Sequence, residues 1–105
     1  LVHTNHYVAP RMKKFEFDPN LISGSIVRYN RGMRLLKNSR GAISVEKLKQ
    51  FLSDHVNHPY GICRHGETIK TTFSIIINLN TLTMWLAKGN PCEVKYNEYK
   101  LFSSR

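Results

Sequence analysis

The sequence predicts an α+β fold, in which a strand and two helices are followed by a three-strand antiparallel meander. Polarity alternates along residues 1–9, and apolar residues recur at helical spacing between residues 25 and 56. The C-terminal half is rich in β-branched and aromatic residues and is divided by short turn sequences. Helices packed on one face of a sheet are the simplest arrangement for this order of elements.

The first predicted element is a strand over residues 1–9 that ends at Pro10. In a strand, successive side chains point to opposite faces, so Thr4 and His6 would face one side and Asn5 the other. Residues 10–20 are expected to form a loop that closes with the turn sequence Asp18-Pro19-Asn20.

The next predicted element is a helix over residues 25–37, with Ser23 or Ser25 as its N-cap. Gly41 is a plausible left-handed stop after it. Its core-facing stripe at i, i+3 and i+7 spacing would consist of Ile26, Tyr29, Met33 and Leu36.

A second helix is predicted to begin after the N-cap Ser44 and to end near Val56, ahead of Pro59. Ile43 and Leu48 occupy the two positions of a hydrophobic staple. Both helices would therefore present an apolar face to the sheet.

The meander is predicted from strands over residues 68–78, 82–88 and 93–102, separated by turns at 79–81 and 89–91. The third strand is more polar and is expected near an edge of the sheet. One face of the first strand would carry Ile69, Thr71, Phe73, Ile75 and Ile77, with Ile76 on the other face.

Length and charge set limits on function. The 105 residues suffice for one small domain or for part of a larger one. The formal charge of +9 admits anionic partners, but we expect the acidic complement in a missing part of a longer protein and do not expect nucleic acid as a partner. No apolar run approaches the ~20 residues needed to span a bilayer, so no membrane is expected. The two cysteines demand no oxidising compartment, and a cytoplasmic location is expected.

Histidines and cysteines suggest two kinds of chemistry, a metal site and a cysteine nucleophile. Two H-x2-H pairs occur at residues 3–6 and 55–58, and Cys63-Arg64-His65 adds a thiol, but no C-x2-C accompanies them. We expect surface or hydrogen-bonded histidines and no metal. A Cys63 nucleophile with a histidine base and a Cys63–Cys92 disulfide remain open alternatives, although buried free thiols are favoured.

A basic helix and a polar strand are the other candidates. A solvated outer face is favoured for the helix cations, but the alternative function is a small basic binding module for nucleic acid or anionic surfaces. A strand-borne Asn5 could donate its amide to a developing oxyanion, although a buried Asn that satisfies backbone groups is commoner. The basic residues are Arg28, Arg31, Arg34, Lys37 and Arg40.

The order of motifs resembles a known family. The motifs are Thr4-Asn5-His6-Tyr7, then residues 25–31 opening a helix, residues 43–48, residues 62–65, and Gly89-Asn90-Pro91-Cys92. This order is similar to that in the C-terminal half of the acyl-coenzyme A:6-aminopenicillanic acid acyltransferase-like (isopenicillin-N acyltransferase-like) family, which belongs to the N-terminal-nucleophile hydrolases.

The resemblance implies an αββα sandwich of two sheets between helical layers, and a precursor that cleaves itself to expose a nucleophilic N-terminal cysteine. The substrate would be a small amide or thioester, acyl-coenzyme A included, and no cofactor is implied. Residues 1–105 would be the C-terminal portion of one such domain. The match assigns Asn5 as oxyanion donor and Arg28 to substrate binding or site organisation.

The nucleophilic cysteine would lie upstream of Leu1, so this chain alone is predicted to be inactive. Its expected partners are its substrate and the remainder of the parent polypeptide. Exposed sheet edges would also favour association into a homo-oligomer.

Overall fold

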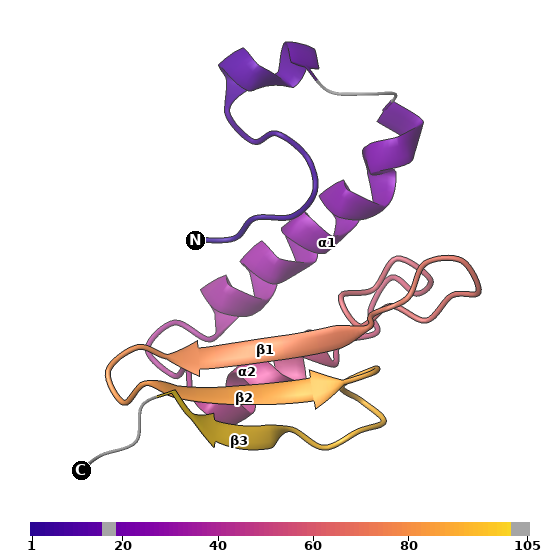
Figure 1. Ribbon diagram of the computed structural model, residues 1–105. Helices are drawn as coiled ribbons and strands as arrows, with labels where there is room; N and C mark the ends of the chain where they lie inside the picture. The colour runs from indigo at the N-terminus through magenta and orange to yellow at the C-terminus, as the bar shows by residue number, and fades with distance from the viewer. Residues whose placement is uncertain (16–18, 102–105) are drawn as a thin grey trace.

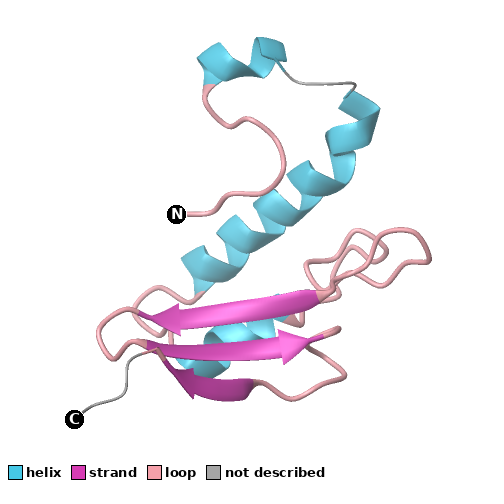
Figure 2. Cartoon of the chain, viewed as in Figure 1, coloured by secondary structure: helices cyan, strands magenta, loops and turns pink. Residues whose placement is uncertain are grey.

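The computed structural model describes residues 1–15 and 19–101, with the backbone alone for residues 19–22 (Figure 1). A short 3-10 helix precedes two α-helices and a three-stranded sheet, which confirms the predicted α+β class (Figure 2). The elements are η1 (Pro10–Phe15), α1 (Pro19–Asn38), α2 (Val45–Leu52), β1 (Phe73–Asn78), β2 (Thr83–Lys88) and β3 (Asn97–Lys100).

Residues 1–9 do not form the predicted strand; they run irregularly beside α1 (Figure 1). A strand needs a neighbouring backbone to satisfy its polar groups, and this segment pairs with no strand in the described part of the chain. The helix supplies partners instead. The Thr4 hydroxyl donates to the Ser25 carbonyl over 2.9 Å, and the backbone N–H of Asn5 donates to the Ser25 hydroxyl over 2.5 Å.

Helix α1 begins at Pro19, six positions before the predicted start at Ser25. Proline is favoured at a first helical position, where its missing N–H is not needed, so the turn signal at Pro19 was a helix start. Ser23 and Ser25 therefore lie inside the helix and neither is its N-cap. Asp18, the first residue of that predicted turn, lies outside the described residues.

The predicted core-facing stripe of α1 is only partly buried. Tyr29 and Leu36 are half-buried, whereas Ile26 is 39% and Met33 45% exposed. Much of α1 extends beyond the sheet (Figure 1), so the sheet cannot cover the full stripe. Gly41 has the predicted left-handed conformation, with a φ of 80°, and lies in the turn that follows the end of α1 at Asn38.

Helix α2 begins where predicted and ends earlier. The Ser44 hydroxyl caps it by accepting the Lys47 N–H over 3.1 Å. The helix ends at Leu52, so the predicted end near Val56 is wrong. The following chain folds back, and the Cys63 N–H donates to the Asp54 carbonyl over 2.9 Å.

The sheet is an antiparallel meander in the order β1-β2-β3, as predicted; β2 begins one residue later than predicted, and the other two strands are several residues shorter. Strand β1 begins at Phe73 and β3 at Asn97, so residues 68–72 and 93–96 lie outside the strands. The polar β3 is at an edge, as expected, and all four of its residues are exposed. The predicted end of the third strand at Phe102 lies outside the described residues.

The two sheet faces differ sharply in burial. Helix α2 lies behind the sheet (Figure 1), where Ile76 is 6% exposed and Ala87 is fully buried. Phe73, Ile75 and Ile77 share the opposite face, as predicted, but they are exposed. We call this opposite surface the open sheet face; its large side chains are Phe73, Ile75, Ile77, Met84, Leu86 and Tyr99. Among the described helices, none is long and apolar enough to cross a membrane.

Candidate functional site

The candidate site is organised by Ser25, a buried serine within α1. Its hydroxyl accepts the Asn5 N–H and lies 3.0 Å from the Thr4 hydroxyl and 2.8 Å from Nδ1 of His6. The His6 ring also stands edge-on to Tyr29, with 5.5 Å between ring centroids. One helical serine thus holds three consecutive residues of the N-terminal segment, and that fixes the position of Asn5.

The two site residues that the sequence predicted, Asn5 and Arg28, are in direct contact. Nη2 of Arg28 donates to Oδ1 of Asn5 over 2.8 Å. A guanidinium carries donors only, so the atom of Asn5 that faces it must be the carbonyl oxygen. The Asn5 amide nitrogen, with its two N–H donors, therefore points away from Arg28. This contact brings the predicted residues together, and their catalytic roles stay predictions.

A second arginine, Arg64, lies close to Arg28, and the guanidinium groups of both lie near Gly24 of α1. A methyl group at Gly24 would stand 3.4 Å from Nη1 of Arg28 and 3.5 Å from Nη1 of Arg64. The Arg64 guanidinium also sits 5.5 Å from the centre of the Tyr60 ring. Burial lowers the pKa of Arg28, and the charge of Arg64 lowers it further. Within the described residues, neither arginine makes an ion pair with a carboxylate, so the pair can attract an anion.

Arg28 also lines a pocket of about 270 Å³ between the N-terminal segment, α1 and α2. Thr4 and Arg28 line it together with aliphatic and aromatic side chains. An apolar pocket with a few polar groups at its margin is the usual form of a small-molecule site. Its apolar lining consists of Val2, Leu36, Phe51, Leu52 and Ile62.

The other cations predicted for a basic face, which lie on α1 and in the turn after it, do not form one continuous surface. Arg31 donates two hydrogen bonds to the Asp54 carboxylate, both of 2.9 Å, and the resulting pair is largely shielded from solvent. Arg34, Lys37 and Arg40 are exposed. Two of the five cations predicted for a phosphate-binding face are therefore engaged in contacts within the chain. The alternative of a basic binding module stays a prediction.

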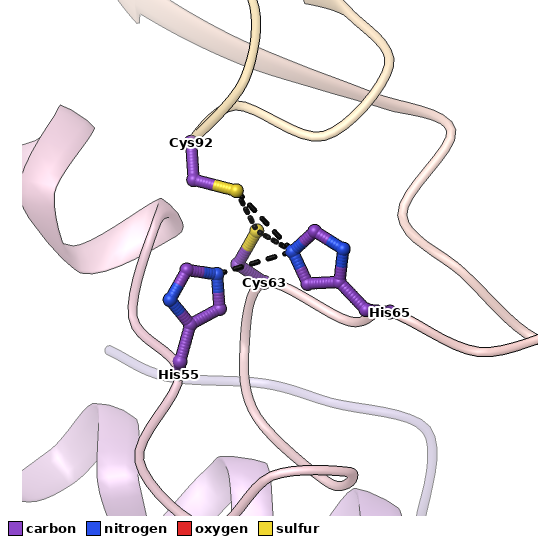
Figure 3. Close-up of side chains that lie close together, drawn as sticks. All are labelled: His55, Cys63, His65 and Cys92. Carbon is purple, nitrogen blue, oxygen red and sulfur yellow. Dashed lines mark hydrogen bonds between the residues drawn. The ribbon is translucent and has the colours of Figure 1, made fainter.

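A second group of reactive side chains lies between the loop after α2 and the turn after β2 (Figure 3). It contains His55, Cys63, His65 and Cys92, whose nearest ligand atoms all lie within 4.8 Å of one another. We call it the His/Cys cluster. Both cysteines are free. Three of these residues were weighed as metal ligands from the sequence. Cys92 was weighed only as a disulfide partner of Cys63; it comes 27 positions after His65 and joins the histidines only through the fold.

The Cys63 thiol does not have the character of a nucleophile. Its side chain is buried, and burial is the main cause that raises the pKa of Cys63 to about 11; the neighbouring Cys92 and Glu93 also affect it. A thiol with a raised pKa is protonated at neutral pH, and the thiolate is the reactive form. The alternative of Cys63 as a protease nucleophile is therefore disfavoured.

Comparison with known proteins agrees with the order of motifs. The family model of acyl-coenzyme A:6-aminopenicillanic acid acyl-transferase matches residues 1–93, which include both site residues, the two helices and the β1–β2 hairpin. A search of curated proteins gave no match. The match over most of the sequence means that this chain belongs to the acyl-coenzyme A:6-aminopenicillanic acid acyl-transferase family.

Proposed function

We propose that this chain supplies the oxyanion-binding and anion-binding part of an amide hydrolase or acyltransferase. The nucleophile would be the N-terminal cysteine that a longer parent polypeptide exposes by cleaving itself. The observation that carries this proposal is the hydrogen bond from Arg28 to Oδ1 of Asn5, which turns the side-chain amide donors of Asn5 away from Arg28 and leaves them for another acceptor. Family membership supports the reaction class.

In the proposed reaction, the cysteine thiol gives its proton to the α-amino group of the same residue, and the sulfur attacks the substrate carbonyl carbon. The electrons of the C=O bond move to oxygen, and an N–H of Asn5 stabilises the resulting anion. Collapse of this intermediate expels the amine, or the thiol of a thioester, with the proton returned from the α-amino group. Water or an amine then takes the acyl group from sulfur and restores the thiol.

The cations and the pocket indicate the kind of substrate. Arg28 and Arg64 both reach Gly24 and lack an acidic partner among the described residues, so a substrate carboxylate is the natural ligand for them. The pocket that Arg28 lines is mainly apolar and suits an aliphatic or aromatic acyl group. The proposed substrate is therefore an acyl amide or thioester that also carries an anionic group.

The open sheet face supports the proposed parent polypeptide. Phe73 is 59%, Ile75 43% and Ile77 48% exposed, side by side on β1. Contiguous exposed apolar surface of this kind usually marks an interface. In an αββα sandwich this face would pack on a second sheet, which the remainder of the parent would provide.

The first test uses the full reading frame of the parent. We expect mass spectrometry to find two chains, the larger beginning with cysteine and containing this segment. Asn5→Ala should lower kcat on an acyl-amide substrate about 10²–10³-fold, as loss of an oxyanion donor does. Asn30→Ala is the matched control, because Asn30 is exposed on α1. A single uncleaved chain, or equal loss in both variants, would refute the proposal.

The second test addresses Arg28. Arg28→Lys keeps the charge but cannot reproduce the planar hydrogen-bonding geometry of a guanidinium, so the Asn5 amide should lose its fixed orientation. We expect lower kcat and weaker binding of anionic substrates. Arg34→Lys, an exposed position on the same helix, is the control and should leave both unchanged. This chain expressed alone should show no turnover, and hydrolysis abolished by Cys63→Ala would contradict that.

A further inference from the structure

We propose that the His/Cys cluster is a structural Zn²⁺ site, with His55, Cys63, His65 and Cys92 as its four ligands. This proposal does not depend on the proposed amide chemistry. Two thiolates and two imidazoles form one of the standard ligand sets for structural zinc. Soft thiolates together with imidazoles favour zinc over magnesium or calcium, which prefer oxygen ligands.

The distances within the His/Cys cluster match a tetrahedron around zinc. With Zn–S near 2.3 Å and Zn–N near 2.05 Å, the edges of a tetrahedral site are about 3.8 Å for S–S, 3.3 Å for N–N and 3.6 Å for S–N. The Cys63 and Cys92 sulfurs lie 3.6 Å apart, and the Nε2 atoms of His55 and His65 lie 3.1 Å apart. Nε2 of His65 is 3.6 Å from the Cys63 sulfur and 3.2 Å from that of Cys92.

Four of the six edges are therefore already within about 0.4 Å of those expected for zinc. The other two join His55 to the sulfurs and are no longer than 4.8 Å. Because His55 is exposed, its ring can turn toward the sulfurs without displacing core side chains. As Figure 3 shows, His65 and both sulfurs already converge on one point that His55 faces.

The backbone builds this convergence from distant parts of the chain. The Cys63 N–H donates to the Asp54 carbonyl over 2.9 Å, which returns the loop to the position of His55. Gly61 allows this close approach, because a methyl group there would stand 3.1 Å from the Asp54 carbonyl oxygen and 3.2 Å from Cα of His55. Cys92 then arrives from the turn after β2.

Groups around the ligands suit a bound cation. Oε1 of Glu93 lies 3.8 Å from Nδ1 of His65, the ring nitrogen that would not bind the metal. A carboxylate beside the second nitrogen of a ligating histidine is a recurring feature of zinc sites, because it fixes the ring and its tautomer. Loss of the two thiol protons to solvent on binding would give two negative charges, which balance Zn²⁺.

All four positions of the tetrahedron come from the protein, so no place remains for water or substrate, as in structural rather than catalytic zinc sites. The metal would join the loop of residues 53–72 to the turn after β2. That loop contains no helix or strand and needs such a tie.

The experiment is zinc titration of the reduced, chelator-treated full chain against a chromophoric competitor. Co²⁺ titration follows as a probe of geometry. We expect one equivalent of zinc per chain, and a cobalt spectrum with tetrahedral d–d bands and thiolate charge transfer. Cys92→Ser and His55→Gln change exposed ligands and should leave the fold intact by circular dichroism. Each should weaken zinc binding by more than the about 10–100-fold that loss of an outer-shell partner costs.

His58→Gln is the matched control, because this exposed histidine is on the same loop but outside the cluster. It should bind zinc as the wild type does. Three results would overturn the proposal: no stoichiometric uptake by the folded, reduced chain; unchanged affinity in both ligand variants; or an equal loss in the control. A Cys63–Cys92 disulfide in the purified protein overturns it too if the reduced form then binds no zinc.

Discussion

The ion pair between Arg31 and Asp54 offers the clearest test of what holds α1 to the rest of the chain. Nε and Nη2 of Arg31 each donate to a different oxygen of Asp54 over 2.9 Å. The side chains are 21% and 12% exposed. The main cause of the raised pKa of Arg31 is its hydrogen bond to Asp54. Asp54→Asn keeps the shape of the side chain but replaces one acceptor with a donor, which then faces the guanidinium.

The free energy of unfolding that Asp54→Asn should remove lies between two limits. Exposed ion pairs contribute about 0–1 kcal/mol, and removal of one partner from a fully buried pair costs about 3–5 kcal/mol. Hydrogen bonds to charged groups are individually worth about 1.5–3 kcal/mol, and Asp54→Asn loses one of two. For a largely shielded pair we therefore expect Asp54→Asn to lower the free energy of unfolding by about 1–3 kcal/mol.

Urea unfolding at neutral pH measures this, with a double-mutant cycle that adds Arg31→Met to keep the apolar stem. The expected coupling energy is about 1–2 kcal/mol. Glu46→Gln is the control, because Glu46 is 80% exposed in its 3.3 Å pair with Lys49. It should cost at most about 0.5 kcal/mol. A coupling energy below about 0.3 kcal/mol would show that the contact does not hold α1 in place.

Three further substitutions test local features. Ser25→Ala should lower stability by about 1–3 kcal/mol and speed hydrogen exchange in residues 4–6, because partly buried polar groups of these residues lose the Ser25 hydroxyl as a hydrogen-bond partner; unchanged exchange would contradict this. Ser44→Ala should cost about 1 kcal/mol in urea unfolding through loss of the α2 cap, and Ser44→Gly only a few tenths. Gly41→Ala should cost about 1–2 kcal/mol, because a φ of 80° is strained for residues with a side chain, although nothing crowds the site. Gly41→Asn should be milder, and equal stability of all three proteins would count against that strain.

Elements specified by neighbouring residues were predicted well. Ser44 with its following apolar face identified α2, and the turn at residues 79–81 between a β-branched run and a second, mainly apolar run identified the hairpin. The strand predicted for residues 1–9 was wrong, because alternating polarity gives a strand only if another strand is available to pair with it. The burial of the open sheet face could not be predicted for a similar reason. The pattern showed that Phe73, Ile75 and Ile77 share a face but not what covers that face.

In the candidate site, too, the contacts between residues distant in sequence could not be predicted. Asn5 and Arg28 were assigned by resemblance to a family, and the structure adds the contact that turns the side-chain amide donors of Asn5 away from Arg28. Arg64 was missed as a neighbour of Arg28, because the two are 36 positions apart in the sequence and only the fold brings their guanidinium groups together near Gly24. The His/Cys cluster was discounted because its ligands do not follow the spacing of zinc-binding turns. The usable signal was one Cys and three His within residues 55–65, two of which, His55 and His65, join the cluster.

The two sites are connected through one loop. Arg64 stands between the proposed zinc ligands Cys63 and His65, so a bound metal would fix the backbone on both sides of it. Its guanidinium is one of the two that meet at Gly24. Removal of zinc should therefore release Arg64 and weaken anion binding beside Arg28. Titration of the zinc-loaded and zinc-free chain with a small carboxylate ligand measures this. Arg64→Ala should weaken binding in the loaded form and abolish its dependence on zinc; equal affinities with and without zinc would show that Arg64 is held by Tyr60 and α1 alone.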